Sequence, residues 1–313
     1  MTPEQAIRDW AKRRGFRIAF AGIGLLDSVR ERIEGFGARG DFAPGFAEEN
    51  LNVFRYLDDT RIKDPRAILL AVIPAPAWIL RFEHPAGSVE AILPPTYVRY
   101  RPLFEETRLE LLNDVLAGNA GIETLQAPLK SLAVGVGLAS YGRNNIAYAP
   151  EYGSYFQIAG YILDFPVEGA VRDARFDRRL DLCAACKACV RACSRGAIAE
   201  DRFLIRADRC FTLFSESESP FPEDVRPPSP DCLIGCLRCQ EVCPANRGLL
   251  SRRRTPVSFT EEETAALLSA GAIEDARLRE RIDSKFKTLA LTEGVPVLRR
   301  NLRLLFGRRA VHY

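Results

Sequence analysis

The sequence lacks a strong net charge, a long apolar run and a recognisable leader. Its 313 residues carry 44 basic and 41 acidic side chains, so the net charge of +3 does not indicate a dedicated nucleic-acid binder. No stretch of about 18 or more apolar residues is present, which excludes an ordinary membrane-spanning helix. Residues 1–30 also lack the charged and then apolar pattern of a secretory leader. We therefore expect a soluble, cytoplasmic protein without a membrane partner.

What the sequence does have is a large apolar fraction and nine unevenly placed cysteines. Hydrophobic residues make up 47% of the chain, which is enough for one large domain or two ordinary ones. All nine cysteines lie between Cys183 and Cys243. Cysteines of an intracellular protein are normally reduced, so such clustering indicates metal binding rather than disulfides.

Hydrophobic patterning predicts an α+β protein. A capping motif at Thr2 predicts a helix to about Arg14, and helices are also predicted at residues 102–116, 275–289 and 297–306. Apolar runs bounded by turn residues predict strands at 16–21, 67–73, 78–82, 146–148 and 155–163. A second capping box at residues 260–263 starts the helical tail.

The composition divides the chain into three parts. It changes abruptly after Arg172, where cysteine, arginine and proline become frequent, and changes again near Gly248. We expect an α+β domain over residues 1–172, a cysteine-rich module over 173–250 and a helical C-terminal region over 251–313.

The cysteine spacings are typical of two [4Fe-4S] clusters. The first run, C-x2-C-x2-C-x3-C from Cys183, is the spacing by which bacterial ferredoxins hold three corners of one cube and give the fourth thiolate to the other. The second run, from Cys232, ends in the same way but begins with an irregular three-residue gap, which makes Cys232 the spare cysteine. One cluster is therefore assigned to Cys183, Cys186, Cys189 and Cys243, and the other to Cys193, Cys210, Cys236 and Cys239. Zinc is the alternative for paired cysteines, but a zinc ribbon does not need the three-cysteine run.

Four segments resemble, in order and spacing, the epoxyqueuosine reductase family, which shares its core with the reductive dehalogenases. They are residues 132–156, the cysteine run from Cys183, residues 207–212 and residues 234–244. The resemblance implies a nitroreductase-like domain that holds cobalamin base-off, followed by a ferredoxin-like module with two [4Fe-4S] clusters. It also implies that Cys210 is a cluster ligand and that no ligand stands at Cys232.

The resemblance further implies which residues approach the corrin. They are glycines, which would let the backbone come close, together with aromatic and polar neighbours: Gly135, Gly137, Tyr141, Gly142, Asn144, Tyr152, Gly153, Ser154 and Tyr155. Without the resemblance, the same residues are better interpreted as ordinary turn glycines and core tyrosines.

The chain departs from the reductase pattern just before the helix at residue 102. Epoxyqueuosine reductases carry an acidic residue there, whereas residues 95–101 (PTYVRYR) contain no carboxylate. Reductive dehalogenases pair a tyrosine with a basic residue, so we take Tyr100 or Tyr97 as the candidate proton donor and Arg143 as its basic partner. The alternative is that the tyrosines pack against the corrin or a neighbouring strand and that Arg143 holds a propionamide or a carboxylate.

Three functions follow from these patterns. The first is an epoxyqueuosine reductase-like enzyme that takes electrons from a ferredoxin or flavodoxin and acts on transfer RNA. In that case the basic tail would contact phosphate, although solvation or pairing with residues 261–263 is the more ordinary role of its residues Arg299, Arg300, Arg303, Arg308 and Arg309. The second is a dehalogenase-like reductase of a small molecule. The third is a non-catalytic carrier that reduces a partner's corrinoid or flavin.

Overall fold

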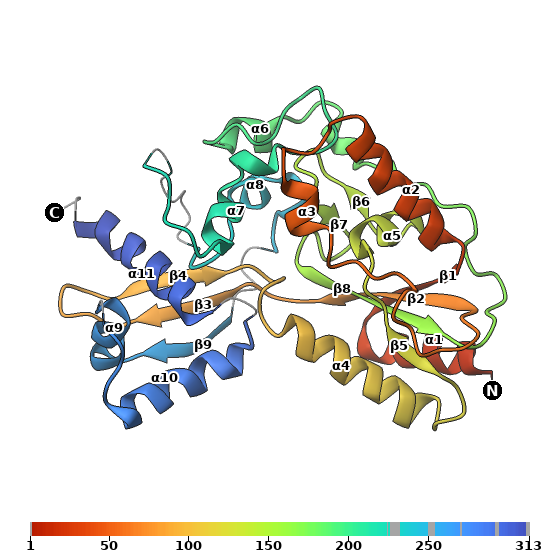
Figure 1. The fold of residues 1–313 in the computed structure, drawn as a ribbon, viewed down its shortest axis with the longest axis horizontal. Helices are drawn as coiled ribbons and strands as arrows, with labels where there is room; N and C mark the ends of the chain where they lie inside the picture. The colour runs from red at the N-terminus through yellow and green to blue at the C-terminus, as the bar shows by residue number, and fades with distance from the viewer. Residues whose placement is uncertain are drawn as a thin grey trace. The chain divides into compact units, whose positions relative to one another are not determined.

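The computed structural model describes residues 2–223, 225, 232–249, 254–269, 271–291 and 294–310; at 254–256 and 308–310 it describes the backbone only. The chain forms two compact units, each built from several segments of the sequence (Figure 1). Unit 1 comprises Met1–Pro74, Arg101–Lys187 and Ile198–Asp208, and unit 2 comprises Ala75–Tyr100, Ala188–Ala197 and Arg209–Tyr313. These two units are defined by contacts in space. The division of the sequence at residues 172 and 250 was based on composition, and it stays a prediction.

Unit 1 is built on a four-stranded antiparallel sheet in the order β1-β2-β8-β5. The strands are β1 (Arg17–Gly22), β2 (Ala67–Pro74), β8 (Phe156–Leu163) and β5 (Ile122–Thr124). In β2 every residue but the last is buried. A strand covered on both faces needs a continuous apolar run rather than an alternating one, and residues 67–73 supply it. The strands predicted at 16–21, 67–73 and 155–163 are confirmed.

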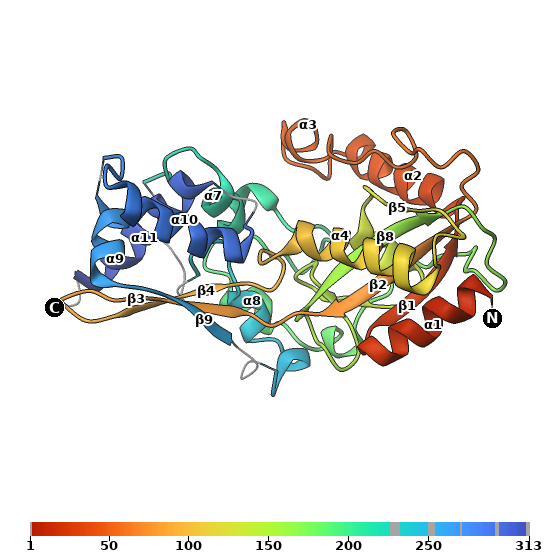
Figure 2. The same cartoon turned by 90° about the horizontal axis from the view of Figure 1, so that it is seen from below.

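Helices cover both faces of this sheet. Gly160 and Tyr161 are consecutive residues of β8, so they face opposite sides. Gly160 lies against Leu129 of α5 (Leu129–Gly135), whereas the Tyr161 hydroxyl donates to the Phe104 carbonyl of α4 (Tyr100–Glu110) at 3.0 Å. The view from below shows α4 in front of the sheet, together with α1 (Pro3–Arg14) (Figure 2).

Local sequence signals explain where several elements of unit 1 begin and end. The Thr2 hydroxyl accepts from the Gln5 amide at 3.2 Å, which confirms the predicted N-terminal cap of α1. The helix predicted at 102–116 is α4 continued by a π-helical turn, η1 (Leu111–Val115), against which α1 packs. The remaining elements are α2 (Leu25–Ala38), α3 (Phe46–Asn50) and the two-residue strands β6 (Ser140–Tyr141) and β7 (Ala147–Tyr148).

Unit 2 contains a three-stranded sheet that joins distant parts of the sequence. The order is β4-β3-β9, from β4 (Val89–Leu93), β3 (Trp78–Phe82) and β9 (Arg254–Phe259), and β9 runs parallel to β3. The rings of Phe82 and Phe259 stack at 4.7 Å between these two strands. The C-terminal region was predicted to be helical, and β9 corrects that prediction: a short polar segment with a proline becomes an edge strand because β3 offers it a partner.

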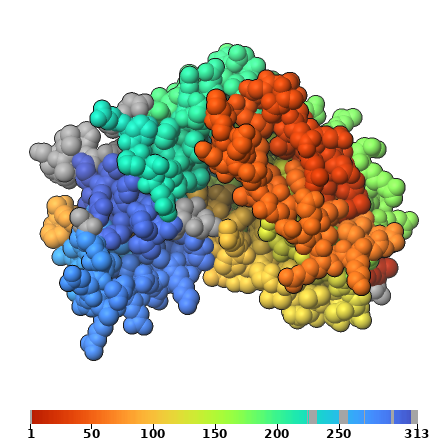
Figure 3. Space-filling model, in the orientation of Figure 1, coloured from red at the N-terminus to blue at the C-terminus, as the bar shows by residue number. Residues whose placement is uncertain are grey.

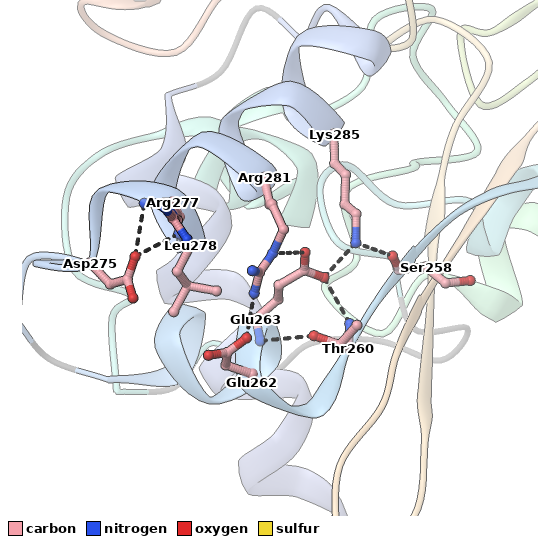
Figure 4. A network of polar contacts seen from close by, with 9 residues as sticks. All are labelled: Ser258, Thr260, Glu262, Glu263, Asp275, Arg277, Leu278, Arg281 and Lys285. Carbon is pink, nitrogen blue, oxygen red and sulfur yellow. Dashed lines mark hydrogen bonds and ion pairs between the residues drawn. The ribbon is translucent and has the colours of Figure 1, made fainter.

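Three C-terminal helices complete unit 2: α9 (Glu261–Leu268), α10 (Ala276–Leu289) and α11 (Val295–Ala310). The predicted capping box is confirmed, because Thr260 and Glu263 exchange side-chain and backbone hydrogen bonds at the start of α9. Figure 4 shows that Lys285 and Arg281 of α10 also bind the Glu263 carboxylate. Burial favours a raised pKa for Glu263, but these hydrogen bonds and positive charges hold its pKa below the usual carboxyl value.

Short helical turns surround the cysteines. They are η2 (Asp181–Cys183) and η3 (Ala207–Arg209), with α6 (Ala188–Ala192), α7 (Phe211–Glu216), α8 (Arg238–Glu241) and η4 (Pro244–Asn246). Within the described ranges, none of the helices has both the length and the apolar character needed to cross a membrane.

Candidate functional site

All nine cysteines lie among the described residues, and none of them is in a disulfide. Cys183 and Cys186 belong to unit 1, and the seven others belong to unit 2. Among the described residues, no group of three or more His, Cys, Asp or Glu side chains is arranged to hold a single metal ion. In an iron-sulfur cube, by comparison, each thiolate binds a different iron.

The two C-x2-C-x3-C ends form the same local structure. Cys189 lies in α6 and Cys239 lies in α8, and these two short helices pack against each other. After each helix the chain turns back toward it, since the Cys193 amide donates to the Cys189 carbonyl and the Cys243 amide donates to the Gln240 carbonyl, both at 3.2 Å. The similar cysteine spacing therefore produces a similar turn after α6 and after α8.

Three thiols of the second predicted cluster lie close enough to influence one another. The pKa of Cys236 is raised to about 11, mainly by burial and in smaller part by the nearby Cys210 and Cys193 thiols. Burial also raises the pKa of Cys210, with a smaller contribution from Cys193. The Cys193 sulfur accepts a hydrogen bond from the Ala197 amide at 3.3 Å. Thiolates gathered in this way need positive charge to offset their mutual repulsion, and the irons of a cluster supply it.

Cys232 lies in a different setting from these thiols. It is 7% exposed, forms a β-bridge with Ile92 and precedes Leu233, whose amide donates to the Ile92 carbonyl at 2.8 Å. The residue therefore extends the edge of the β4-β3-β9 sheet as a small buried side chain. This setting is consistent with the prediction that Cys232 is the spare cysteine.

Arg143 holds the backbone that carries the first two cysteines. Its guanidinium donates to the carbonyls of Cys183 at 2.6 Å, Cys186 at 3.4 Å and Glu200 at 3.1 Å. A planar guanidinium suits this task because its donors diverge in fixed directions toward several acceptors. These acceptors are backbone carbonyls, so neither role predicted for Arg143, orienting a tyrosine or holding a propionamide or a carboxylate, is tested by them.

The two candidate proton donors have different surroundings. The Tyr97 hydroxyl donates to the Glu216 carboxylate at the end of α7, and its ring covers Gly235, where an added Cβ would lie 2.8 Å from the ring. Tyr97 therefore lies beside the residue that precedes Cys236. Burial raises the pKa of Tyr100. The phenol of Tyr100 is thus kept protonated at neutral pH.

The residues that the resemblance assigns to the corrin are largely in contact with their own unit. An added Cβ at Gly135 would lie 2.7 Å from the Phe176 ring, and one at Gly142 would lie 2.6 Å from the Tyr148 ring. These two glycines are explained by close approach of protein side chains. Gly137 and Gly153 have φ of +83° and +54°, which is the conformation that favours glycine in a turn.

The aromatic and polar members of that set are also engaged. The Tyr141 hydroxyl and the Ser131 hydroxyl are hydrogen-bonded at 2.9 Å, and Tyr141 is 2% exposed. Asn144 donates to the Tyr148 hydroxyl at 2.9 Å, and Tyr152 donates to the Gly15 carbonyl at 2.7 Å. Ser154 and Tyr155 are buried. These contacts match the ordinary interpretation of core tyrosines and turn residues.

Comparison with known proteins identifies the relatives of this arrangement. Residues 182–246 match the 4Fe-4S double cluster binding domain. The epoxyqueuosine reductase of Bacillus subtilis is 30% identical over 262 residues, which cover 78% of this chain, and that of Staphylococcus aureus is 24% identical over 79% of it. The structure of the Streptococcus thermophilus epoxyqueuosine reductase matches 99% of this chain and 82% of its own with a TM-score of 0.71 at 17% identity. The chain is therefore similar to epoxyqueuosine reductases along most of its length.

The similarity covers only part of the length of these relatives. The chain spans 64% of the length of the Bacillus subtilis relative and 65% of the Staphylococcus aureus one. A structure of the Bacillus subtilis epoxyqueuosine reductase with its aspartate catalytic loop swung out of the active site matches 97% of this chain with a TM-score of 0.68 at 21% identity. The fold of the family and its double-cluster domain are thereby shown, whereas activity, substrates and partners are proposals.

The basic tail has a role that the sequence did not indicate. Arg299 and Arg303 donate to carbonyls at the end of α9, including those of Leu267 at 3.1 Å and Leu268 at 2.9 Å. The last carbonyls of a helix lack intrahelical partners and attract such donors. The ordinary role expected for these arginines was solvation or pairing with residues 261–263; Glu262 and Glu263 pair with Arg281 and Lys285 instead. The side chains of Arg308 and Arg309 lie outside the described residues.

Sequence reasoning also missed a buried polar contact. Asn301 is 5% exposed and lies in an arginine-rich helix among the buried residues Leu298, Leu302 and Leu305. One signal was available: an uncharged polar residue falls on the i, i+3, i+4, i+7 stripe that otherwise reads as apolar. Such a residue needs hydrogen-bond partners in the core.

Proposed function

We propose that the chain is a cobalamin-dependent iron-sulfur reductase that cleaves a carbon-heteroatom bond, with epoxyqueuosine in transfer RNA as its substrate. The observation that carries the proposal is the approach of Cys193, Cys210 and Cys236 within a segment that matches the double-cluster domain. The clusters would supply single electrons at low potential. An external ferredoxin or flavodoxin would reduce them.

The ligand assignment is part of the proposal. One [4Fe-4S] cluster is held by Cys193, Cys210, Cys236 and Cys239, and the approach of the first three supports it. The other is held by Cys183, Cys186, Cys189 and Cys243, which is supported by the ferredoxin spacing and by the arginine that fixes the backbone of its first two members. A cytoplasmic location is proposed as well, because cysteines that bind clusters have to be kept out of disulfides.

Cobalamin, bound base-off in a nitroreductase-like domain ahead of a ferredoxin-like module, is proposed from the similarity to epoxyqueuosine reductases. The residues first assigned to it do not fit a corrin surface at Gly135, Tyr141 and Gly142, because protein side chains fill those positions. Tyr97 or Tyr100 remains the proposed proton donor with Arg143 as its basic partner. The raised pKa of Tyr100 keeps its proton in place at neutral pH.

Transfer RNA is proposed as the substrate because a relative has been solved with an epoxyqueuosine-modified tRNA stem loop. Two observations favour other functions. The absence of a carboxylate from residues 95–101 favours a dehalogenase-like reductase of a small molecule. The filled positions at Gly135 and Gly142 favour a carrier that reduces a partner's corrinoid or flavin.

One experiment separates these functions. Anaerobically purified protein is reconstituted with cobalamin, and EPR is used to look for five-coordinate, base-off Co(II) that remains bound after desalting. The enzyme proposal predicts this signal, followed by reduction of an epoxyqueuosine-containing stem loop. Turnover of a halogenated small molecule without RNA would favour the dehalogenase-like function. Iron-sulfur absorbance with no retained cobalamin would favour the carrier.

A further inference from the structure

The C-terminal helix α11 contacts the segments that lead to two proposed ligands of the second cluster. Helix α7 begins directly after Cys210, and residues 233–235 lead directly to Cys236. Figure 3 shows the teal surface of α7 directly against the blue surface of α11, and the two helices are in contact. The contacts between these elements are polar as well as apolar.

Asn301 connects both segments through one side chain. Its carboxamide nitrogen donates to the Ser215 carbonyl of α7 at 2.8 Å and to the Leu233 carbonyl at 2.9 Å. Both amide hydrogens are thus used, and the side chain is buried. A third bond closes the network, because the Gly235 amide donates to the Ser215 hydroxyl at 2.8 Å.

Arg300, the residue before Asn301, makes further hydrogen bonds to the end of α7. Its guanidinium donates to the Phe214 carbonyl at 3.0 Å and to the Ser217 carbonyl at 2.6 Å, at the end of α7. It also donates to the Asn301 carboxamide oxygen at 2.9 Å, which fixes the orientation of that amide. A cation at the C-terminus of a helix is in the favourable position for the helix dipole.

We propose that Asn301, oriented by Arg300, is a positioning residue for the second cluster: it keeps Cys210 and Cys236 at the separation that one cube requires. The inference rests on the proposed function, since it assumes that these two cysteines share a cluster. It goes further by assigning a cluster-assembly role to a helix outside the cysteine motifs. The contacts of Asn301 and Arg300 lead to Cys210 and Cys236, so we expect the effect to fall on this cluster.

The test is a comparison of two variants of the same helix in the full chain. Asn301→Leu removes both hydrogen bonds and keeps the branched shape of the side chain, whereas Arg303→Ala removes a cap of α9. After anaerobic reconstitution, Asn301→Leu should hold about four irons and four sulfides, against about eight of each in the wild type and in Arg303→Ala. EPR of the reduced variant should show one isolated cluster instead of two interacting ones.

A second variant distinguishes the proposed positioning role from general misfolding. Ser215→Ala keeps the carbonyl of residue 215 but removes the acceptor of the Gly235 amide, and we expect one of its two clusters to be lost to a chelator several-fold faster than in Arg303→Ala. Retention of about eight irons by Asn301→Leu, or equal chelation rates of Ser215→Ala and Arg303→Ala, would overturn the inference. Loss of both clusters together in the Ser215→Ala variant would do the same. Wild-type protein without clusters would instead refute the proposed function.

Discussion

The cysteine segment and the glycine-tyrosine segment at residues 132–156 were both predicted to bind a cofactor, but the contacts of their residues differ. In the first, residues predicted to share a cofactor approach one another: the pKa of Cys236 is raised mainly by burial, with smaller contributions from the Cys210 and Cys193 thiols. In the second, Tyr141 and Gly142 are already explained by protein contacts. Thiols have few structural uses in such numbers, whereas glycine and tyrosine have many. Residue types with one chemical use are therefore the stronger evidence for a cofactor.

The largest effect should come from the cysteines themselves. Cys210→Ser should reduce the iron content by half, from about eight to about four, because a serine hydroxyl is a poor ligand for iron. Cys232→Ser is the matched control, since Cys232 is a buried residue at the sheet edge and should leave both clusters in place. Iron and sulfide analysis of the two purified variants distinguishes them, and the opposite pattern would refute the ligand assignment.

Gly135→Ala tests the second segment. The added methyl group would lie 2.7 Å from the Phe176 ring and 3.0 Å from the Ala174 methyl group, so we expect a loss of about 1–3 kcal/mol in the free energy of unfolding. Gly24→Ala is the control, because nothing lies within 4 Å of its added methyl group. Thermal unfolding measures both. An unchanged stability with lost cobalamin binding would show that Gly135 faces a corrin after all.

Arg143→Lys separates the structural and catalytic roles of this residue. Lysine keeps the charge but loses the planar fork, so we expect a loss of about 1–2 kcal/mol in stability and faster loss of the first cluster to a chelator. Lys187→Gln, which breaks an exposed ion pair with Glu200, should change stability by less than about 1 kcal/mol. If Arg143→Lys keeps both clusters and stability but loses turnover, Arg143 serves the proton donor instead.

Tyr97→Phe should have the smallest effect on stability. The ring that covers Gly235 is retained, and the hydrogen bond to Glu216 is lost, at a cost of about 1 kcal/mol. Tyr152→Phe is the control, since it also removes a hydrogen bond from a tyrosine hydroxyl. Stability is followed by chemical denaturation, and turnover is measured on the same preparations. A proton donor at Tyr97 would show as lost turnover with both clusters intact.

The sequence predicted much of the fold because most elements carry local signals. The buried run of β2, the Thr2 cap and the box at Thr260 and Glu263 each form as expected. Strand β9 was not predicted, because its pairing with β3 depends on a partner far away in the sequence. Propensity alone does not indicate such a pairing.

Part of the candidate site could also be predicted from the sequence. Cysteine spacing indicated the ligands, since each cube needs a fixed number of thiolates. The supports of those ligands were not predictable, because Arg143, Ser215 and Asn301 act through backbone carbonyls and amides that any sequence provides. Only the folded chain shows which carbonyl a side chain meets.

The most direct test of the central claim is metal analysis of the wild-type chain. Anaerobically reconstituted protein should contain about eight irons and eight sulfides per chain, and its reduced form should give the EPR signal of two interacting [4Fe-4S] clusters. Stoichiometric zinc without inorganic sulfide would contradict the account, because the nine cysteines would then form a structural metal site and carry no electrons.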